Sequence, residues 1–420
     1  MKFIKKKVKQ LVDYKSGYTW TKEQELNNSE PSAIRVLTVS NIQSVLDLSS
    51  IMYLKKVSPK DKLEKTASKN WTIAVSSNGN RKRIGNAIFI NEDTEYLFAS
   101  FLTGFIPKEN SGLLPEYFFR WFTSYEVQEK ISAVAEGTTE LRNMSLRHLR
   151  NSFIEYPESE DEQRTISNIL NSVDEAIATT EISIAKAERL KKSLMQNLLS
   201  GKLKANGSWR KEKDFYKHEK FGNSPVGWHW GRLSEIADVI AGQSPAGEFY
   251  NDEGKGMPML NGPTEFTDHH PIPVQYTTKT TKLCEVGDIL FTVRGSSTGR
   301  MNIADQQYCI GRGIAAIRNK EGSDIDFIYY TLITIAEKIL AEARGSGTTF
   351  PNVNRGELLK KWVLIPESGQ EEIAKKIKSV NAILNSKQTK IKKLERLKKA
   401  LMQNLLTGKV RVKIKAEQTA

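Results

Sequence analysis

The sequence of 420 residues is poor in the residues that stabilise folds through disulfides or bound metal, with two cysteines and five histidines. Two cysteines are too few for a disulfide framework or a structural zinc site, so we expect Cys284 and Cys309 to be strand or core residues rather than nucleophiles. No apolar run approaches the length needed to cross a membrane. Residues 1–10 are charged and lack the apolar segment of a signal peptide. These absences predict a soluble cytoplasmic protein with no membrane partner.

Motifs for catalysis are also missing. The sequence has no Asn-Pro-Pro-aromatic signature of adenine methylation, and Gly254-Lys255 is followed by Gly256, where a phosphate-binding loop needs Ser or Thr to contact magnesium. His269 and His270 could suggest metal ligands, but they lie between two prolines, as in a polar loop. We therefore predict no catalytic residue, no metal site and no cofactor bound by this chain.

One sign of charge is in excess. The chain has 63 Lys and Arg residues against 49 Asp and Glu residues, a net charge of +14. An excess of this size favours a polyanionic partner such as nucleic acid. A run such as Lys5-Lys6-Lys7 is also consistent with an ordinary solvated face, and the basic cluster 390–413 could equally contact an acidic protein.

A segment with helical character occurs twice. Residues 188–202 and 395–409 are identical at 13 of 15 positions, and the copies lie 207 residues apart. Such a duplication within one chain predicts two structurally related halves.

Apolar residues in both copies recur at steps of three and four, which is typical of a heptad-like helical seam. In the first copy the seam comprises Ile166, Leu170, Val173, Ile177, Ile184, Leu194 and Leu198. In the second copy it comprises Ile373, Ile377, Val380, Leu384, Ile391, Leu401 and Leu405. Gly201 and Gly408 follow as expected C-terminal caps. Matching seams predict that the helices pack on each other; the alternative is that each seam packs on its neighbouring domain.

The chain order is domain, helix, domain, helix. We assign a first domain at 1–155, a first spacer helix at 156–201, a linker at 202–224, a second domain at 225–364, a second spacer helix at 365–413 and a tail at 414–420. The domains follow a common plan, since Leu11-Val12-Asp13 leading to Gly17 is answered by Ile236-Ala237-Asp238 leading to Gly242. Two basic domains on a stiff spacer suit a bipartite site on a DNA duplex.

Polar loops are the best candidates for DNA contact, because phosphates attract cations and base edges suit bidentate donors. In the first domain the candidates are Asn80, Arg81, Lys82, Arg83, Thr138, Thr139, Arg142 and Asn143. In the second domain they are Gln243, Ser244, Arg294, Ser296, Arg300, Thr348, Thr349, Asn352 and Asn354. For Gln243 and Ser244 the alternative role is to cap a turn, and any single candidate could be exposed without contacting DNA.

Leu-Met-Gln-Asn-Leu-Leu-x-Gly-Lys closes both helices, and four further stretches are characteristic: 225–228, 241–245, 287–290 and 311–318. With the domain–helix plan, these residues resemble the specificity subunit of type I restriction-modification enzymes over essentially the full length. The first half departs from the pattern, because Gly17-Tyr18-Thr19-Trp20 replaces the Gly-x-Ser-Pro motif.

The resemblance implies a mixed α+β fold, in which two globular α/β target recognition domains are separated by two long antiparallel helices. These helices would form a coiled coil with approximate two-fold symmetry within the chain. Each domain would read one half of a split, asymmetric DNA sequence. The helices would dock two modification subunits, which bring S-adenosylmethionine and methylate adenine. Separate motor-nuclease subunits would bring ATP, magnesium and DNA cleavage.

Two other functions fit parts of the sequence. The chain could be a stand-alone DNA-cleaving or DNA-modifying enzyme with an unrecognised active site, which would act on DNA without partner proteins. It could also be a coiled-coil adaptor whose basic face binds an acidic protein, which would show no sequence-dependent affinity for DNA.

Overall fold

The computed structural model describes residues 2–43, 45–137, 141–345 and 351–413. The chain divides into two compact units. The first unit joins Met1–Glu181 with Thr389–Ala420, and the second unit is Ile182–Gln388. Both long helices, α6 (Glu160–Leu199) and α10 (Gln370–Leu405), therefore contribute one part to each unit.

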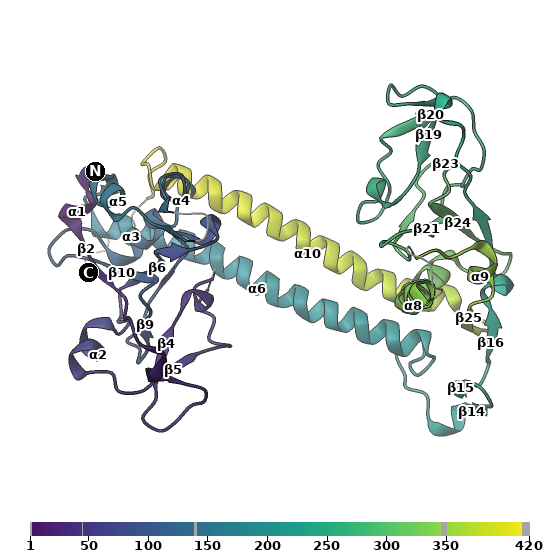
Figure 1. The fold of residues 1–420 in the computed structure, drawn as a ribbon, viewed down its shortest axis with the longest axis horizontal. Helices are drawn as coiled ribbons and strands as arrows, with labels where there is room; N and C mark the ends of the chain where they lie inside the picture. The colour runs from purple at the N-terminus through teal and green to yellow at the C-terminus, as the bar shows by residue number, and fades with distance from the viewer. Residues whose placement is uncertain (1, 44, 138–140, 346–350, 414–420) are drawn as a thin grey trace, which may run out of the picture. The chain divides into compact units, whose positions relative to one another are not determined.

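The first unit combines small sheets with short helices (Figure 1). Its two four-stranded sheets have the strand orders β2-β10-β6-β8 and β3-β5-β4-β9. The strands of these sheets are β2 (Val12–Ser16), β3 (Glu25–Leu26), β4 (Ile34–Leu37), β5 (Met52–Leu54), β6 (Thr72–Val75), β8 (Ala87–Phe89), β9 (Leu97–Phe98) and β10 (Leu102–Pro107). Two smaller sheets join β1 (Phe3–Lys7) to β13 (Phe153–Pro157), and β7 (Ser77–Asn78) to β12 (Arg142–Asn143) and β11 (Glu136–Gly137). The helices are α1 (Val8–Leu11), α2 (Pro59–Lys65), α3 (Pro115–Phe122), α4 (Tyr125–Ala133) and α5 (Leu146–Asn151).

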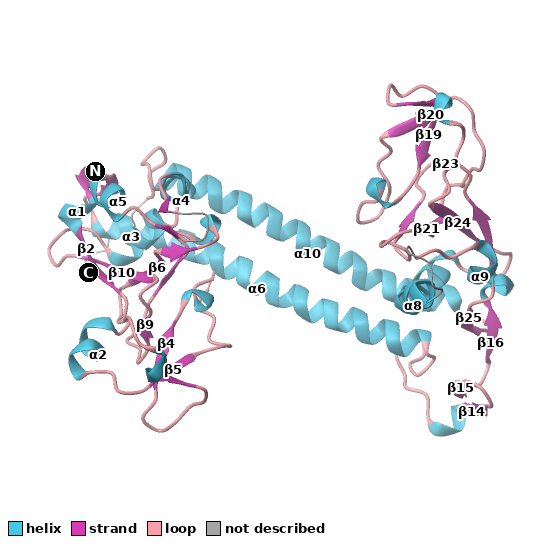
Figure 2. Ribbon diagram, viewed as in Figure 1, coloured by secondary structure: helices cyan, strands magenta, loops and turns pink. Residues whose placement is uncertain are grey.

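The second unit repeats this topology with different residues. Its four-stranded sheets have the orders β17-β24-β21-β22 and β18-β20-β19-β23. Their strands are β17 (Ala237–Ala241), β18 (Tyr250–Asn251), β19 (Met257–Leu260), β20 (Gln275–Thr277), β21 (Ile289–Thr292), β22 (Met301–Ile303), β23 (Cys309–Ile310) and β24 (Ile314–Asn319). The pair β16 (Trp228–Arg232) and β25 (Trp362–Pro366) corresponds to β1 and β13. The helices are α7 (Leu233–Ile236), α8 (Ile325–Gly345) and α9 (Arg355–Leu359), of which α8 and α9 are labelled in Figure 2.

The register of the central strands is also shared. In the first unit Thr103 of β10 lies opposite Ser16 of β2 and Ala74 of β6. In the second unit Ala315 of β24 lies opposite Ala241 of β17 and Phe291 of β21. β6 and β21 are buried along their whole length, so each can lie only in the interior of its unit. The common plan inferred from the sequence is thus a common strand topology.

In the first unit the start of α6 packs on the end of α10. Ile166 and Leu170 lie in the hydrophobic core with Met402 and Leu405. The pairing is antiparallel, because Asp174 accepts from Lys398 Nζ at 2.6 Å while Glu162, earlier in α6, pairs with the guanidinium of the later Arg411.

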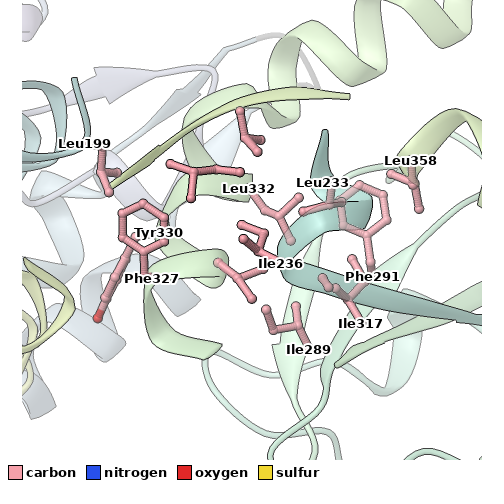
Figure 3. Packing of buried hydrophobic residues seen from close by; sticks show 14 of the residues in the cluster. Leu199, Leu233, Ile236, Ile289, Phe291, Ile317, Phe327, Tyr330, Leu332 and Leu358 are labelled. Atoms are coloured by element: carbon pink, nitrogen blue, oxygen red, sulfur yellow. The ribbon is translucent and has the colours of Figure 1, made fainter. Parts of the chain in front are cut away.

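In the second unit the end of α6 packs on the start of α10. Leu198 shares a core with Ile373 and Ile377, and Figure 3 shows Leu199 of α6 among the residues of this core. All the predicted seam residues of both helices are buried or half-buried. The seams contact the other helix and also the cores of the domains, so both packing alternatives contribute.

A glutamine at the start of each long helix performs the same task. Gln163 Oε1 accepts from the backbone N–H of Leu114, which precedes α3, at 2.8 Å. Gln370 Oε1 accepts from the N–H of Asp324, which precedes α8, at 3.0 Å. The start of α6 is thereby fixed to the start of α3, and the start of α10 to the start of α8, where backbone donors lack helical partners.

Two further segments complete the fold. The helical stretch from Pro115 to Ala133 is interrupted between α3 and α4, where the Thr123 hydroxyl donates to the Phe119 carbonyl and the Ser124 hydroxyl to that of Trp121. Such bonds compete with helix continuation. Segment 202–224 contains a hairpin, β14 (Phe215–His218) and β15 (Gly222–Pro225). Phe221 of its turn stacks on Trp230, with ring centroids 4.2 Å apart.

The structure confirms the predicted fold class, a mixed α/β architecture with two related domains and two long helices. A pair of isoleucines in α10 tests the packing of the seam. Ile377 is fully buried, whereas Ile383 is 48% exposed.

We expect Ile377→Ala to lower the free energy of unfolding of the second unit by about 2–5 kcal/mol, because it removes buried apolar surface and leaves a cavity. The control Ile383→Ala should change it by about 0.5 kcal/mol or less, as for other exposed positions. Urea denaturation followed by circular dichroism measures both. Equal effects of the two substitutions would contradict the packing of this seam.

Candidate nucleic-acid interface

The polar loops predicted from the sequence follow the same path in both units. After β6 the chain continues into β7, where Ser77 lies opposite Asn143 of β12. After β21 the chain reaches Arg294, which forms an isolated antiparallel bridge with Asn352. Each unit thus brings together two candidate stretches that lie far apart in its sequence. The shared feature is the backbone pairing that follows the buried strand, Ser77 with Asn143 in the first unit and Arg294 with Asn352 in the second, which we call the ladder.

Two of the candidate arginines hold a loop in place. Arg83 Nη2 donates to the carbonyls of Val39 and Ile42 at 2.8 and 3.1 Å. In the second unit Arg300 donates to the carbonyls of Pro263 and Phe266 at 3.2 and 2.7 Å. Both guanidinium groups therefore close the turn that follows a strand, β4 in one unit and β19 in the other, and part of their donor capacity is used within the protein.

The other residues of the first basic loop are also partly engaged. Arg81 donates from Nε to the carbonyl of Ser132 and from Nη2 to that of Ala133, both at the end of α4, where a cation is favourable. The Asn80 side chain accepts from the N–H of Lys82 at 3.0 Å and caps the following turn. Lys82 itself is exposed, and within the described part of the chain its ammonium has no hydrogen bond or ion pair.

Three candidates in the second unit have contrasting roles. Ser244 Oγ accepts from the N–H of Arg312 at 3.1 Å, and Asn354 caps α9 by accepting from the N–H of Glu357 at 2.9 Å. Ser244 therefore holds the backbone at Arg312, far along the chain, and the turn-capping alternative for Gln243 and Ser244 stays a prediction. The Gln243 side chain is exposed, and its backbone carbonyl accepts from Thr281.

The remaining candidates are exposed or lie elsewhere. Asn143 and Ser296 are exposed, and Arg142 is half-buried on β12. Thr138, Thr139, Thr348 and Thr349 lie outside the described residues. DNA contact by the candidates that the structure describes stays a prediction.

The second unit has an open hollow of about 540 Å³ beside its ladder. It is lined by Asn261, Gly262, Pro263, Arg294, Gly295, Gly313, Pro351 and Asn352. Around the positions where a Cβ of Gly262 or Gly295 would stand, no other atom lies within 4 Å. The lining thus combines three polar side chains and two prolines with bare glycine backbone, which another molecule can approach closely.

Sequence reasoning did not select Arg312, which is exposed at the same ladder. Gly311 and Gly313 flank it, and a Cβ on either would lie 2.3 Å from an atom of Asn261. These close approaches hold the backbone on both sides of Arg312, and the Gly-Arg-Gly spacing was the signal for it. The corresponding turn of the first unit is identified by its backbone hydrogen bonds. Ser76 N–H donates to the Phe101 carbonyl at 2.9 Å, as Val293 N–H of the second unit donates to the Gly313 carbonyl at 2.9 Å. The large side chain of Phe101 is 49% exposed.

A second feature is a pocket beside each closing helix segment. In the first unit a pocket of about 500 Å³ is lined at the end of α10 by Met402 and Gln403, and just beyond it by Leu406 and Thr407. In the second unit a pocket of about 660 Å³ is lined by the matching residues at the end of α6, Met195, Gln196 and Leu199, and by Ser200 just beyond it. The domain side matches too: Trp121, Ser124 and Tyr125 in one pocket occupy the places of Thr331, Thr334 and Ile335 in the other. The duplicated helix segment therefore faces equivalent pockets.

One apolar residue of the duplicated segment remains exposed in each copy. Leu190 is 51% exposed and Leu397, the same position of the repeat, is 47% exposed. Lysines surround both leucines in sequence, at 191 and 192 and at 398 and 399. Exposed leucines that recur at one position of a repeat suggest a contact surface.

The chemistry of an active site is not evident in the described residues. Cys284 and Cys309 are both fully buried, and burial raises the pKa of the Cys284 thiol to about 11, so it is neutral at pH 7. Among the residues with described positions, no group of His, Cys, Asp or Glu side chains could hold a metal ion. In the same residues no helix combines the length and apolar character of a membrane span.

Comparison with known sequences gives a consistent result. The type I restriction modification DNA specificity domain matches residues 2–189 and again 225–396. A protein of Methanocaldococcus jannaschii named as the specificity subunit of the type I restriction enzyme MjaX is 31% identical over 391 residues, covering 90% of this chain and 87% of the relative. The MjaVIII specificity subunit of the same organism is 25% identical and covers 70% of each chain.

Solved structures share the fold over nearly the full length. The S subunit of a type I restriction-modification system from M. genitalium aligns with a TM-score of 0.63 at 17% identity, covering 96% of each chain. A chain from a study of complex assembly and conformational transition of the type I R-M system aligns with a TM-score of 0.57 at 21% identity, covering 97% of this chain and 98% of that one.

Proposed function

The chain belongs to the family of type I restriction-modification DNA specificity subunits, and we propose that it recognises a bipartite, asymmetric DNA site for a methyltransferase complex. Each domain would contact one half of the site. The chain itself would be non-catalytic, and would dock two modification subunits that methylate adenine. Restriction subunits with motor and nuclease activity would join the same complex.

The observation that carries the proposal is that both units have the same backbone arrangement at the ladder but different side chains there. The backbone hydrogen bonds from Ser76 to Phe101 and from Val293 to Gly313 occupy the same place in the two units. At the position opposite the ladder asparagine, the first unit has Ser77 and the second has Arg294. The first unit therefore has a buried serine where the second has an exposed arginine. Equal frames with different side chains suit two readers of different sequences, because base identity is read by side chains at the groove edge.

The helix segments support docking of two copies of one partner. The domains have diverged, whereas the duplicated segment keeps 13 of 15 residues and forms one wall of an equivalent pocket in each unit. The exposed leucines, Leu190 and Leu397, also recur at one position. Identical surfaces at both copies suit identical partners, as the two modification subunits would be.

Cofactors would belong to the partners. S-adenosylmethionine would bind to the modification subunits, and ATP and magnesium to the restriction subunits. The chain would contribute affinity for DNA through its net charge of +14, a contribution that weakens as salt releases the counterions of the phosphates.

The proposed function is tested by reconstitution. We expect purified chain plus modification subunits and S-adenosylmethionine to methylate adenine at one split sequence, read by single-molecule sequencing of plasmid DNA. The chain alone should neither methylate nor cleave DNA when S-adenosylmethionine, ATP and magnesium are supplied. Cleavage or methylation by the chain alone would instead favour a stand-alone enzyme.

The docking surface makes a prediction on stoichiometry. Leu190→Asp or Leu397→Asp should each reduce the bound modification subunits from two to one, and the double variant should bind none, because each aspartate places a charge in an apolar contact. Native mass spectrometry of the assembled complexes measures the ratio. Leu63→Asp is the matched control, since Leu63 is an exposed leucine of the first unit, at 86% exposure, outside the repeat. Three variants that all retain two partners would contradict docking at this position.

The length of α6 makes a prediction on spacing. Four residues inserted between Ala178 and Ile182 should lengthen the helix by about 6 Å at 1.5 Å per residue. At about 3.4 Å per base pair along a strand, the unread spacer of the methylated site should grow by one or two base pairs while both half-sequences stay the same. The same four residues inserted after Gly254, in a loop of the second unit, should leave the spacer unchanged. An unaltered spacer in an active helix-insertion variant would rule out α6 as the element that sets it.

A further inference from the structure

Arg294 and Asn352 form a pair of polar side chains on the wall of the hollow in the second unit. Their backbones lie directly opposite each other in the bridge, and Arg294 Nε donates to Asn352 Oδ1 at 3.3 Å. Both residues are exposed. The asparagine therefore holds the guanidinium by its inner edge and leaves the outer edge toward solvent.

The outer edge of this guanidinium offers only donors. Within the described residues, Arg294 Nη1 and Nη2 have no hydrogen-bond partner. In the major groove guanine presents two acceptors, N7 and O6, side by side. Adenine and cytosine each present an amino donor there, and thymine presents a single acceptor beside a methyl group. Two parallel N–H donors thus match guanine and no other base.

The surroundings leave room for a base edge. Gly262 and Gly295 border the hollow with no atom near their missing side chains. Gly313 is packed against the Asn261 backbone, and the Val293 N–H donates to the Gly313 carbonyl at 2.9 Å. Arg294 follows Val293 directly, so its backbone is anchored one residue away.

We propose that Arg294, oriented by Asn352, reads a guanine in the half of the DNA site that the second unit contacts. This inference rests on the proposed function as a DNA specificity subunit. It also predicts an asymmetry between the units, because the first unit has Ser77 opposite Asn143 at this position. A serine lacks the paired donors, so the first unit does not read guanine there.

The test uses the full chain assembled with its modification subunits and the methylated sequence that this complex yields. A guanine should be required at one position of one half-site. Arg294→Gln should shift the preference at that position alone away from guanine, toward adenine, by about 10- to 100-fold, since glutamine pairs with the N6 and N7 atoms of adenine. Arg294→Lys should retain the guanine with weaker discrimination.

Atomic substitution in the DNA supplies the second measurement. Replacing that guanine by 7-deazaguanine removes the N7 acceptor and should weaken binding by wild-type complex about 10-fold, a size typical of losing part of a bidentate contact. For the complex carrying Arg294→Ala, the same replacement of guanine by 7-deazaguanine should weaken binding little further. The effects of the protein change and of the DNA change are then not additive. Fluorescence anisotropy with labelled duplexes measures the four affinities. Because it records binding, this assay also covers variants that no longer methylate.

Lys255→Gln is the matched control, an exposed cation of the same unit that already pairs with Glu253. It should alter neither the methylated sequence nor the effect of 7-deazaguanine. An unchanged sequence in Arg294→Gln, additive effects of the two changes, or weakening spread evenly over all positions would each overturn the assignment while leaving the proposed function intact. Wild-type complex without any methylated sequence would instead overturn the proposed function and, with it, this inference.

Discussion

The interaction on which both units depend is the packing of one part of α6 against one part of α10. In the first unit Ile166 and Leu170 complete a core that also needs Met402 and Leu405. In the second unit Leu198 serves the same purpose with Ile373 and Ile377. Each core therefore draws on one segment of α6 and one segment of α10, which lie far apart in the chain. Burial of these side chains stabilises the domain and the helix pairing together.

The two units share contacts between the long helices and the domain helices, while some of the side chains that make these contacts differ. The equivalent glutamines, Gln163 and Gln370, keep one hydrogen-bonding role. At another shared contact between α6 or α10 and a domain helix, the buried Arg120–Asp174 ion pair of the first unit is replaced by the hydroxyl–amide pair of Tyr330 and Asn381. Either interaction is compatible with the shared backbone arrangement, because each provides hydrogen-bond partners for the polar side chains at this contact. Exposed loop positions carry no such constraint, and there the two units differ most.

The sequence predicted the features that periodicity and repetition encode. The duplicated helices, their seams and the common domain plan could be read from spacing alone, because apolar positions in a helix must recur every three to four residues. The partners of individual arginines could not. Arg83 and Lys82 look equivalent in a basic run, yet only Arg83 meets two carbonyls that folding brings from residues 39 and 42. The pairing of Arg294 with Asn352 likewise depends on a bridge between residues far apart in the chain.

The composition of the first unit has a consequence for biosynthesis. The second unit is one continuous stretch, Ile182–Gln388, whereas the first needs residues from Thr389 onward. Glu162, buried at the start of α6, meets its partner Arg411 only after the ribosome has made almost all of the chain. The domain synthesised first is thus the last that can close, and its exposed core must stay unaggregated while the later domain folds. During synthesis, the amino-terminal half is therefore the part of the chain that needs protection by chaperones.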